Sequence, residues 1–250
     1  MAKKKSDPVF EFKPIGYVQS IFKDRFAVPR QPGLAAQVPG IIKINPDPDL
    51  KLALRRLEEF SHIWILFVFH DHGGKKWKPS IRPPRLGGKE KVGVLSSRSP
   101  HRPNPIGISA VVLNKIDYDA KGGIEIHVGG IDLIDATPVL DVKPYIPYAD
   151  SIPDANPGWA FDKIQKFPVQ FSEESEKDIE THDPKKKFNL KQLVSEILEL
   201  DPRPAFQKTK FPVGNKDSIG KQYGFDILHF NIDYEISKKG FLVFKITDKS

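Results

Sequence analysis

Three segments in the first 150 residues combine arginines or carboxylates with prolines. They are FAVPRQPG at 26–33, SRSPHRPNPIGISA at 97–110 and GGIDLIDATPVLDVKPY at 129–145. A guanidinium can hold a carboxylate or phosphate through two parallel hydrogen bonds, and a carboxylate can bind ribose hydroxyls or accept a proton. Prolines reduce the entropy that a loop loses when it orders around a ligand. Each segment alone could be a rigid turn, but the three together favour a binding site.

The net charge of +7 comes entirely from the first part of the chain. Residues 1–150 carry 23 Lys and Arg against 16 Asp and Glu, whereas residues 151–250 carry 16 of each. Residues 75–102, here called the basic block, hold nine basic residues and a single acid, Glu90. Such a block attracts polyanions such as nucleic acid. The alternative, a solvated surface without a partner, is about equally compatible with the charge alone.

Several common chemistries are excluded or disfavoured. The chain has no cysteine, which rules out disulfides, thiolate zinc sites and thiol catalysis. It contains no glycine-rich dinucleotide motif after a strand, no phosphate-binding P-loop and no nucleophile elbow. His70 and His72 flank Asp71 without a third ligand at recognisable spacing, so no metal is expected. The longest apolar run, 63–69, is too short to cross a membrane, and we expect an intracellular, cytoplasmic protein.

The elements that must position these segments are mostly strands. Strands are expected within 9–22 and at 63–69, 92–95, 106–116 and 124–128, with a turn at Gly122-Gly123. The run 63–69 is apolar throughout, which predicts burial on both faces. A helix capped by Asp47 should carry an apolar stripe from Leu50 to Phe60. Many strands and few helices predict a closed or strongly curved sheet, and therefore a mainly β fold.

The second part of the chain reads as a smaller α+β unit. A proline-rich connection spans 144–158, and the charged stretch 171–187 is expected to form a helix or a loop. An amphipathic helix follows at 190–198, capped by Asn189. Alternating apolar residues on both sides of Lys238-Lys239-Gly240 predict a hairpin. We therefore predict two domains, at 8–152 and 153–250.

Six motifs in one order resemble the TsaA-like family, also known as the TrmO or YaeB family. They are FAVPRQPG, FSHIWILFVFH, RPPRLGG, VGVLSSRSPHRPNPIG, IDLIDATPVLDVKPY and LDPRPAF. The resemblance covers about 10–152 and resumes at 201–206. It departs at Phe206, where the family motif usually ends in tyrosine, which puts any role of that hydroxyl in doubt.

The resemblance implies an S-adenosylmethionine-dependent tRNA methyltransferase. The implied target is N6 of threonylcarbamoyladenosine next to the anticodon, and the implied fold is an N-terminal β-barrel rather than a Rossmann sheet, in a homodimer. The implied cofactor-binding residues are Pro29, Arg30, Gln31, His70, Asp71, Arg98, Asp132, Leu133, Ile134 and Asp135. Within that set, Asp135 and His70 are candidates for accepting the N6 proton, with bound water as a third possibility. In-line methyl transfer needs mainly correct positioning of the two reactants.

The basic block then provides candidates for binding the anticodon arm. The residues assigned to tRNA are Lys75, Lys76, Trp77, Arg82, Arg85, Arg102 and Arg203. Trp77 could stack on a base, although an ordinary half-buried tryptophan is at least as compatible. Arg203 could instead complete the cofactor site. Two other functions remain open from the residues: a non-catalytic RNA-binding β-domain, and a methyltransferase acting on another substrate.

Overall fold

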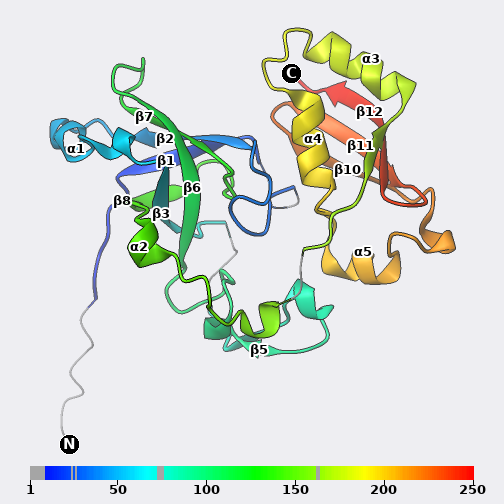
Figure 1. Cartoon of the computed structure of the whole chain (residues 1–250), viewed down its shortest axis with the longest axis horizontal. Helices are drawn as coiled ribbons and strands as arrows, with labels where there is room; N and C mark the ends of the chain where they lie inside the picture. Colours follow the sequence, from blue (N-terminus) through cyan, green and yellow to red (C-terminus); the bar gives the residue numbers. More distant parts are fainter. Residues whose placement is uncertain (1–8, 24, 26, 72–75, 162–163) are drawn as a thin grey trace, which may run out of the picture.

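The first part of the chain folds into a closed antiparallel barrel. The computed structural model describes residues 9–23, 25, 27–71, 76–161 and 164–250. In spatial order the barrel consists of β1 (Gly16–Ser20), β2 (Pro39–Ile44), β7 (Glu125–Gly129), β6 (Ile106–Asp117), β3 (His62–Val68) and β8 (Pro138–Pro144), and pairing of β8 with β1 closes it (Figure 1). The mainly β class and the barrel are therefore confirmed. The hairpin turn at Gly122-Gly123 is confirmed too, because it joins the paired strands β6 and β7.

Alternation along the strands builds the barrel interior. In β3, Ile63, Ile65 and Phe67 are buried, whereas the residues between them are only partly buried. The prediction that this strand is buried on both faces was wrong, because only one face of a barrel strand reaches the interior. Phe67 lies opposite Gly107 of β6, and a Cβ at Gly107 would come within 2.2 Å of the Phe67 ring. A glycine is therefore needed there to let the strands approach.

The helix predicted across 47–60 is shorter than its apolar stripe suggests. Helix α1 (Pro48–Ala53) begins at Asp47, whose side chain accepts a hydrogen bond from the Asp49 N–H at 2.8 Å. Arg56 then adopts a left-handed conformation, with φ of 70°, and a short 3-10 turn follows at Leu57–Glu59. The break at Arg56 turns Leu57 into the core while Phe60 stays exposed.

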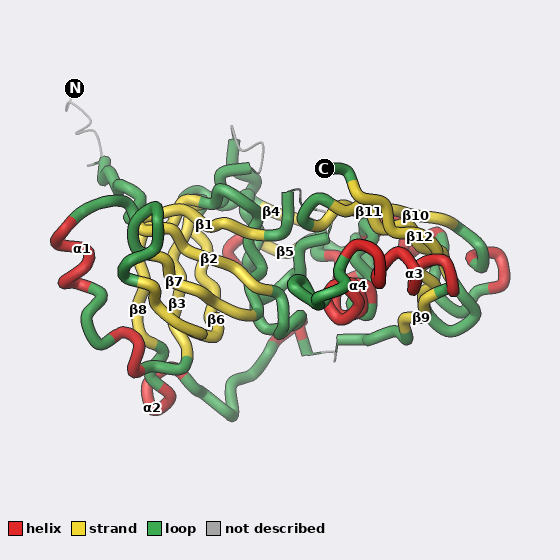
Figure 2. The backbone as a smooth tube through the Cα atoms, turned by 90° about the horizontal axis from the view of Figure 1, so that it is seen from above, coloured by secondary structure: helices red, strands yellow, loops and turns green. Residues whose placement is uncertain are grey.

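A two-stranded sheet carries the basic block outside the barrel. It pairs β4 (Ser80–Ile81) with β5 (Val92–Gly93), and 3-10 turns at Pro84–Leu86 and Val94–Ser96 flank the second strand. In Figures 1 and 2 this small sheet lies between the barrel and the second sheet. The predicted strand 92–95 is therefore realised only in its first half.

The second part of the chain forms a four-stranded sheet with two helices on one face. The order is β10 (Gln222–Ile227), β11 (Phe230–Ile236), β12 (Phe241–Asp248) and β9 (Val169–Phe171), with β9 parallel to β12. Helices α3 (Glu173–His182) and α4 (Leu190–Leu198) cover one face (Figure 2), and α5 (Ala205–Lys210) lies at one end (Figure 1). The predicted hairpin corresponds to β11 and β12. β9 and β10 were missed because their short apolar patterns are weak.

Helix α4 begins where predicted, but its cap differs. Asn189 has a left-handed backbone, and its side chain makes no capping hydrogen bond. The Asp183 carboxylate accepts hydrogen bonds from the N–H groups of Phe188 and Leu190 instead, at 3.2 and 3.0 Å. The donors at the helix start are thus satisfied by a carboxylate five and seven residues upstream of them.

The connection between the two sheets contains α2 (Pro147–Asp150) and a 3-10 turn at Gly158–Ala160. Direct hydrogen bonds also join the two parts: the Leu228 N–H donates to the Ile21 carbonyl at 3.0 Å, and the Gln37 N–H donates to Glu196 Oε2 at 2.9 Å. The division at 152/153 stays a prediction. Within the described residues, no helix has both the length and the apolar character that a membrane span requires.

Candidate functional site

A cavity of about 220 Å³ opens where β3 ends and where the chain passes from β7 to β8. Its walls are Arg25, Val28, Phe67, Val68, Phe69, His70, Asp71, Pro100, His101, Asp132, Leu133, Ile134 and Thr137. All three of the proline-containing segments contribute to it. Five of the predicted cofactor residues are in this wall: His70, Asp71, Asp132, Leu133 and Ile134. Aromatic and aliphatic surfaces dominate, with charged groups at a few positions, as is typical of pockets for organic ligands.

Asp132 is the most perturbed carboxyl group in the cavity wall. Burial raises the pKa of Asp132 to about 6, while a hydrogen bond from Ser109 and the charge of Arg98 act in the opposite direction. Ser109 Oγ donates to Asp132 Oδ1 at 2.6 Å, and Ser109 itself is 1% exposed. Asp132 is therefore mostly ionised at neutral pH although burial disfavours its charge. A buried carboxylate with such a raised pKa is typical of functional sites.

Ser109 was missed by the sequence analysis. It occupies an inward position of β6, between the buried residues Gly107 and Val111. The available signal was a lone hydroxyl in the inward register of an otherwise apolar strand. A buried hydroxyl needs a hydrogen-bond partner, and that partner here comes from 23 residues further along the chain.

Arg98 joins the first two of the three segments. Its Nη1 donates to Gln31 Oε1 at 2.6 Å, while its charge lowers the pKa of Asp132 in the third segment. Arg98 is not itself part of the cavity wall, but it contacts Gln31 and lies close enough to Asp132 for its charge to act there. Because its side chain is exposed, the guanidinium retains donors for a ligand.

Asp135 does not line the cavity, contrary to its prediction as a cofactor and catalytic residue. Its Oδ1 accepts the Ser20 N–H at 2.9 Å, and its Oδ2 pairs with Lys23 Nζ at 2.7 Å. Burial alone would raise the pKa of Asp135, but Lys23 and the backbone donors lower it below its usual value. The residue ties the end of β1 to the segment before β8, and its cofactor and catalytic roles stay predictions.

Arg102 and Arg203, both predicted to bind tRNA, make internal contacts in the structure. Arg102 Nη1 donates to the carbonyls of Ser97 and Ser99, at 2.8 and 3.5 Å, and so braces its own loop. Arg203 is 2% exposed and forms a two-pronged ion pair with Asp201, at 2.7 and 2.8 Å. A direct contact of Arg203 with a large substrate does not fit this burial.

The other predicted residues in the first segment split between two places. Pro29 is buried, and Gln31 contacts Arg98 as described. Arg30 instead lies near the second part of the chain. Burial lowers the pKa of Arg30 below its usual value, and the charge of Asp201 opposes this decrease in part. Arg30 therefore marks the place where the barrel approaches the loop that precedes α5.

In the basic block, Lys76, Trp77, Arg82 and Arg85 are all exposed, and Trp77 is 50% exposed. Lys75 lies outside the described residues. The indole of Trp159, in the connection between the sheets, donates to the Ser96 carbonyl at 3.0 Å and holds the end of the block in place. Among the described residues, no three His, Asp or Glu side chains gather as metal ligands.

We expect Ser109→Ala to raise the pKa of Asp132 above its value of about 6 by about one unit. The lost hydrogen bond stabilises the ionised carboxylate, so its removal favours the protonated form. Carboxyl chemical shifts of Asp132, followed by NMR against pH, measure this directly. Ser109→Cys, nearly equal in size but a weaker donor, should give a smaller shift. An unchanged titration in the alanine variant would show that burial alone sets the pKa.

Comparison with known proteins identifies the family. The family model for the N-terminal domain of tRNA-methyltransferase O matches residues 17–151, and the model for the TrmO C-terminal domain matches 164–249. The chain belongs to the TrmO family. An Escherichia coli relative, named tRNA (adenine(37)-N6)-methyltransferase, is 40% identical over 238 residues, which span 95% of this chain and 97% of that protein.

Two further comparisons cover nearly the same length. A Pseudomonas aeruginosa relative with the provisional name S-adenosylmethionine-dependent methyltransferase RcsF is 38% identical to this chain, over 88% of this chain and 90% of that protein. The crystal structure of TrmO from Pseudomonas aeruginosa superposes with a TM-score of 0.76 and 32% identity, covering 96% of this chain and 99% of that one. Both the barrel and the second sheet of this chain thus lie within the TrmO architecture.

Proposed function

We propose that this chain transfers a methyl group from S-adenosylmethionine to N6 of adenosine 37 in tRNA, in its threonylcarbamoyl form. One observation carries the proposal. In a chain related to the Escherichia coli enzyme along nearly its whole length, three separate loop segments meet at one cavity, whose wall contains the desolvated carboxyl group of Asp132. We also propose a cytoplasmic location and a homodimer, as the resemblance to the family implies.

The donor set around the cavity fits S-adenosylmethionine. Arg98 offers a guanidinium that can pair with the carboxylate of the methionine part. Asp132 and Asp71 offer carboxylates for the ribose hydroxyls or the ammonium group, and neither opposes a sulfonium charge nearby. Phe67, Phe69 and Leu133 supply apolar surface for the adenine. The cofactor would provide the electrophilic methyl group.

The residues of this chain would position the target and receive a proton. The lone pair of the adenosine N6 is delocalised into the ring, so proton removal must accompany or follow methyl transfer. Asp132 is better placed for this than Asp135, because Asp135 is engaged by Lys23 and Ser20. With a pKa of about 6, Asp132 is mostly ionised at neutral pH and still a usable base. His70, also in the cavity wall, is the second candidate.

The exposed basic block would bind the phosphates of the anticodon arm. Its cations lie on and beside the small β4–β5 sheet, and Arg98 belongs to the same block. Salt-dependent affinity for RNA follows from such a surface. A non-catalytic RNA-binding module would share this property, so cofactor binding is the feature that separates the two functions.

The experiment is nucleoside mass spectrometry combined with calorimetry. Purified protein is incubated with S-adenosylmethionine and with tRNA that lacks the N6-methyl group. The tRNA is then digested, and the masses of its nucleosides are measured. We expect one added methyl on threonylcarbamoyladenosine. Arg98→Ala should raise the Kd for the cofactor about tenfold or more, with little change in Tm because the side chain is exposed.

Arg55→Ala, an exposed arginine after α1 and distant from the cavity, is the matched control and should behave as wild type. Unchanged cofactor affinity in Arg98→Ala would refute the assignment of that residue. If the wild-type protein binds the cofactor but methylates another substrate, the chain is a methyltransferase with a different target. If the wild-type protein binds RNA and not the cofactor, the function is that of a non-catalytic RNA-binding module.

A further inference from the structure

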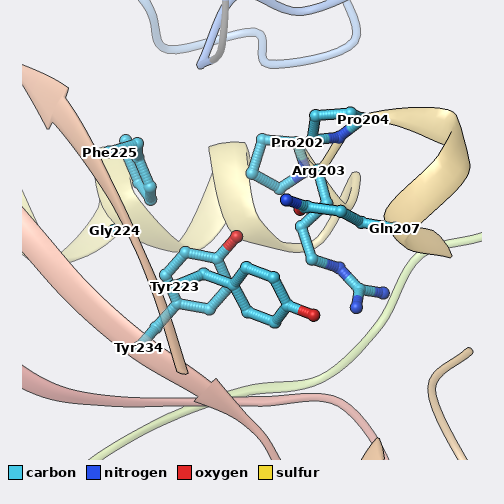
Figure 3. Close-up of a pocket in the computed structure, with 8 residues that line it drawn as sticks. All are labelled: Pro202, Arg203, Pro204, Gln207, Tyr223, Gly224, Phe225 and Tyr234. Carbon is cyan, nitrogen blue, oxygen red and sulfur yellow. The ribbon is translucent and has the colours of Figure 1, made fainter. Parts of the chain in front are cut away.

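A second pocket lies in the C-terminal part of the chain, between the segment 202–207 and the edge strand of the sheet. It has a volume of about 200 Å³, nearly that of the barrel cavity. Its walls are Pro202, Arg203, Pro204, Gln207, Tyr223, Gly224, Phe225 and Tyr234 (Figure 3). The function proposed above does not use this pocket.

The pocket walls are held rigidly. The Arg203 guanidinium is fixed by Asp201 and by the Phe211 carbonyl, which accepts from Nη1 at 2.9 Å. It lies 5.2 Å from the centre of the Tyr223 ring, and that ring stacks on Tyr234 with centroids 5.8 Å apart. Asp201 itself has a positive φ of 51°, a costly conformation for a non-glycine residue that tends to occur at functional sites. Such a preformed pocket loses little entropy when it binds a ligand.

The chemistry of the walls suits a flat heteroaromatic ring. Proline and tyrosine faces offer apolar surface on which a ring can stack. The side-chain amide of Gln207 makes no hydrogen bond to any described residue, and Figure 3 shows it directed toward the space above the tyrosine rings. An amide carries a donor and an acceptor side by side, which is the pattern that glutamine uses to read the edge of a base.

The surroundings of the pocket favour a polyanion. Lys208 follows Gln207 directly, and burial lowers its pKa to about 8, with Asp201 opposing and Arg30 adding to the decrease. Lys208 Nζ donates to the Asp201 carbonyl and lies 3.9 Å from Asp201 Oδ2, and the charges of Arg30 and Arg203 both act on it. Three cations therefore share the single carboxylate of Asp201, and this excess of positive charge favours a nearby anion. Phe206, 69% exposed at the start of α5, adds an aromatic face that needs no hydroxyl.

We propose that this pocket receives one unstacked base of the tRNA anticodon loop other than the methylated adenosine, with a neighbouring phosphate against Arg30 and Lys208. The inference rests on the proposed function, since it takes tRNA as the substrate. It assigns the C-terminal part of the chain the task of holding the loop open while the target base enters the barrel cavity. Arg203 then acts as the support of the pocket wall.

The test measures RNA binding directly, so it does not depend on methyl transfer. Anticodon stem-loop RNAs, each with a single abasic nucleotide in the loop, are titrated against wild-type protein and Gln207→Leu by fluorescence anisotropy. We expect one abasic position, different from 37, to weaken wild-type binding about tenfold. The same abasic RNA should lose much less affinity with Gln207→Leu, because the contact is already absent.

The controls separate this proposal from the proposed function. Gln222→Leu changes an exposed glutamine of β10 outside the pocket wall and should match wild type. Cofactor affinity should be unchanged in Gln207→Leu, and Tm confirms folding. Coupling of Gln207 to position 37, or to no position, would overturn the pocket assignment even if wild-type protein methylates tRNA. Absence of methylation with intact coupling would instead refute only the proposed reaction.

Discussion

Asp201→Asn is expected to lower the free energy of unfolding by about 3–5 kcal/mol. This is the largest loss of stability that we predict for replacing a side chain by one of nearly equal volume. The Asp201 and Arg203 side chains are 6% and 1% exposed and form two short hydrogen bonds. Burial alone would lower the pKa of Arg203, and the hydrogen bonds and charge of Asp201 reverse this. Removing the carboxylate leaves a buried guanidinium without a counter-charge, and that desolvation is the main cost.

The substitution by asparagine tests the charge alone, because it removes the carboxylate without changing the backbone conformation. Asp201 has a left-handed φ, which asparagine tolerates as well as aspartate does. Urea unfolding, followed by tryptophan fluorescence and circular dichroism, measures the loss. Asp226→Asn is the matched control: it breaks an exposed pair with Lys249 and should cost less than about 1 kcal/mol. A loss of that small size for Asp201→Asn would mean that Arg203 finds water or another acceptor.

Asp132→Asn is expected to weaken cofactor binding and, at the same time, to stabilise the free protein. Loss of a charged hydrogen-bond partner should raise the Kd for S-adenosylmethionine about 10- to 100-fold. Asparagine nearly matches the shape of aspartate and can still accept the hydrogen bond from Ser109. The cost of keeping a carboxylate ionised in the cavity wall disappears, however, which should add about 3 kcal/mol of stability at pH 7.

The pH dependence of this difference has a defined sign. The folded-state pKa of Asp132 is about 6, above its ordinary value of 3.8, so the folded protein binds the proton more tightly than the unfolded chain. The contribution of Asp132 to stability therefore falls as the pH rises from about 4 to about 6, and stays low above that. The stability difference between Asp132→Asn and wild type should grow over that range, as urea unfolding at several pH values can measure.

Asp135→Asn is the matched control for this pair of effects. The pKa of Asp135 is lowered by Lys23 and the backbone donors, so its neutralisation should destabilise the protein at pH 7. Cofactor affinity should change little, because Asp135 lies outside the cavity wall. Equal losses of cofactor affinity in the two variants would restore Asp135 as a cofactor ligand.

The barrel and the cavity suggest how the cofactor and target could meet. The cofactor would lie between Arg98 and Asp132, while the basic block and the C-terminal pocket would hold the RNA on either side. Lys76 and Arg82 are available to phosphates because the β4–β5 sheet keeps them outside the barrel. Methyl transfer by positioning of two bound reactants needs few reacting side chains, and Asp132 and His70 in the cavity wall are the candidate bases proposed above.

Sequence patterns located most of the elements and the three segments of the site. Alternation of apolar residues predicted β6, β7 and the hairpin of β11 and β12, because strand burial repeats every two residues. The glycines, prolines and charged residues that punctuate these strands then located the loops that meet at the cavity. His70, Asp71 and Asp132 were predicted from their motifs and all line one wall.

What those patterns left undetermined depends on distant contacts. Asp132 and Asp135 are both carboxylates in one loop, yet one faces a cavity beside Ser109 and the other pairs with Lys23. Arg98 and Arg102 share a loop as well, and only Arg98 keeps donors exposed near Asp132. The order of amino acids was enough to predict the strands and the residue types that they carry. Which of two like side chains is desolvated, paired or free to bind follows from tertiary contacts, because ionisation and availability depend on neighbours from other strands.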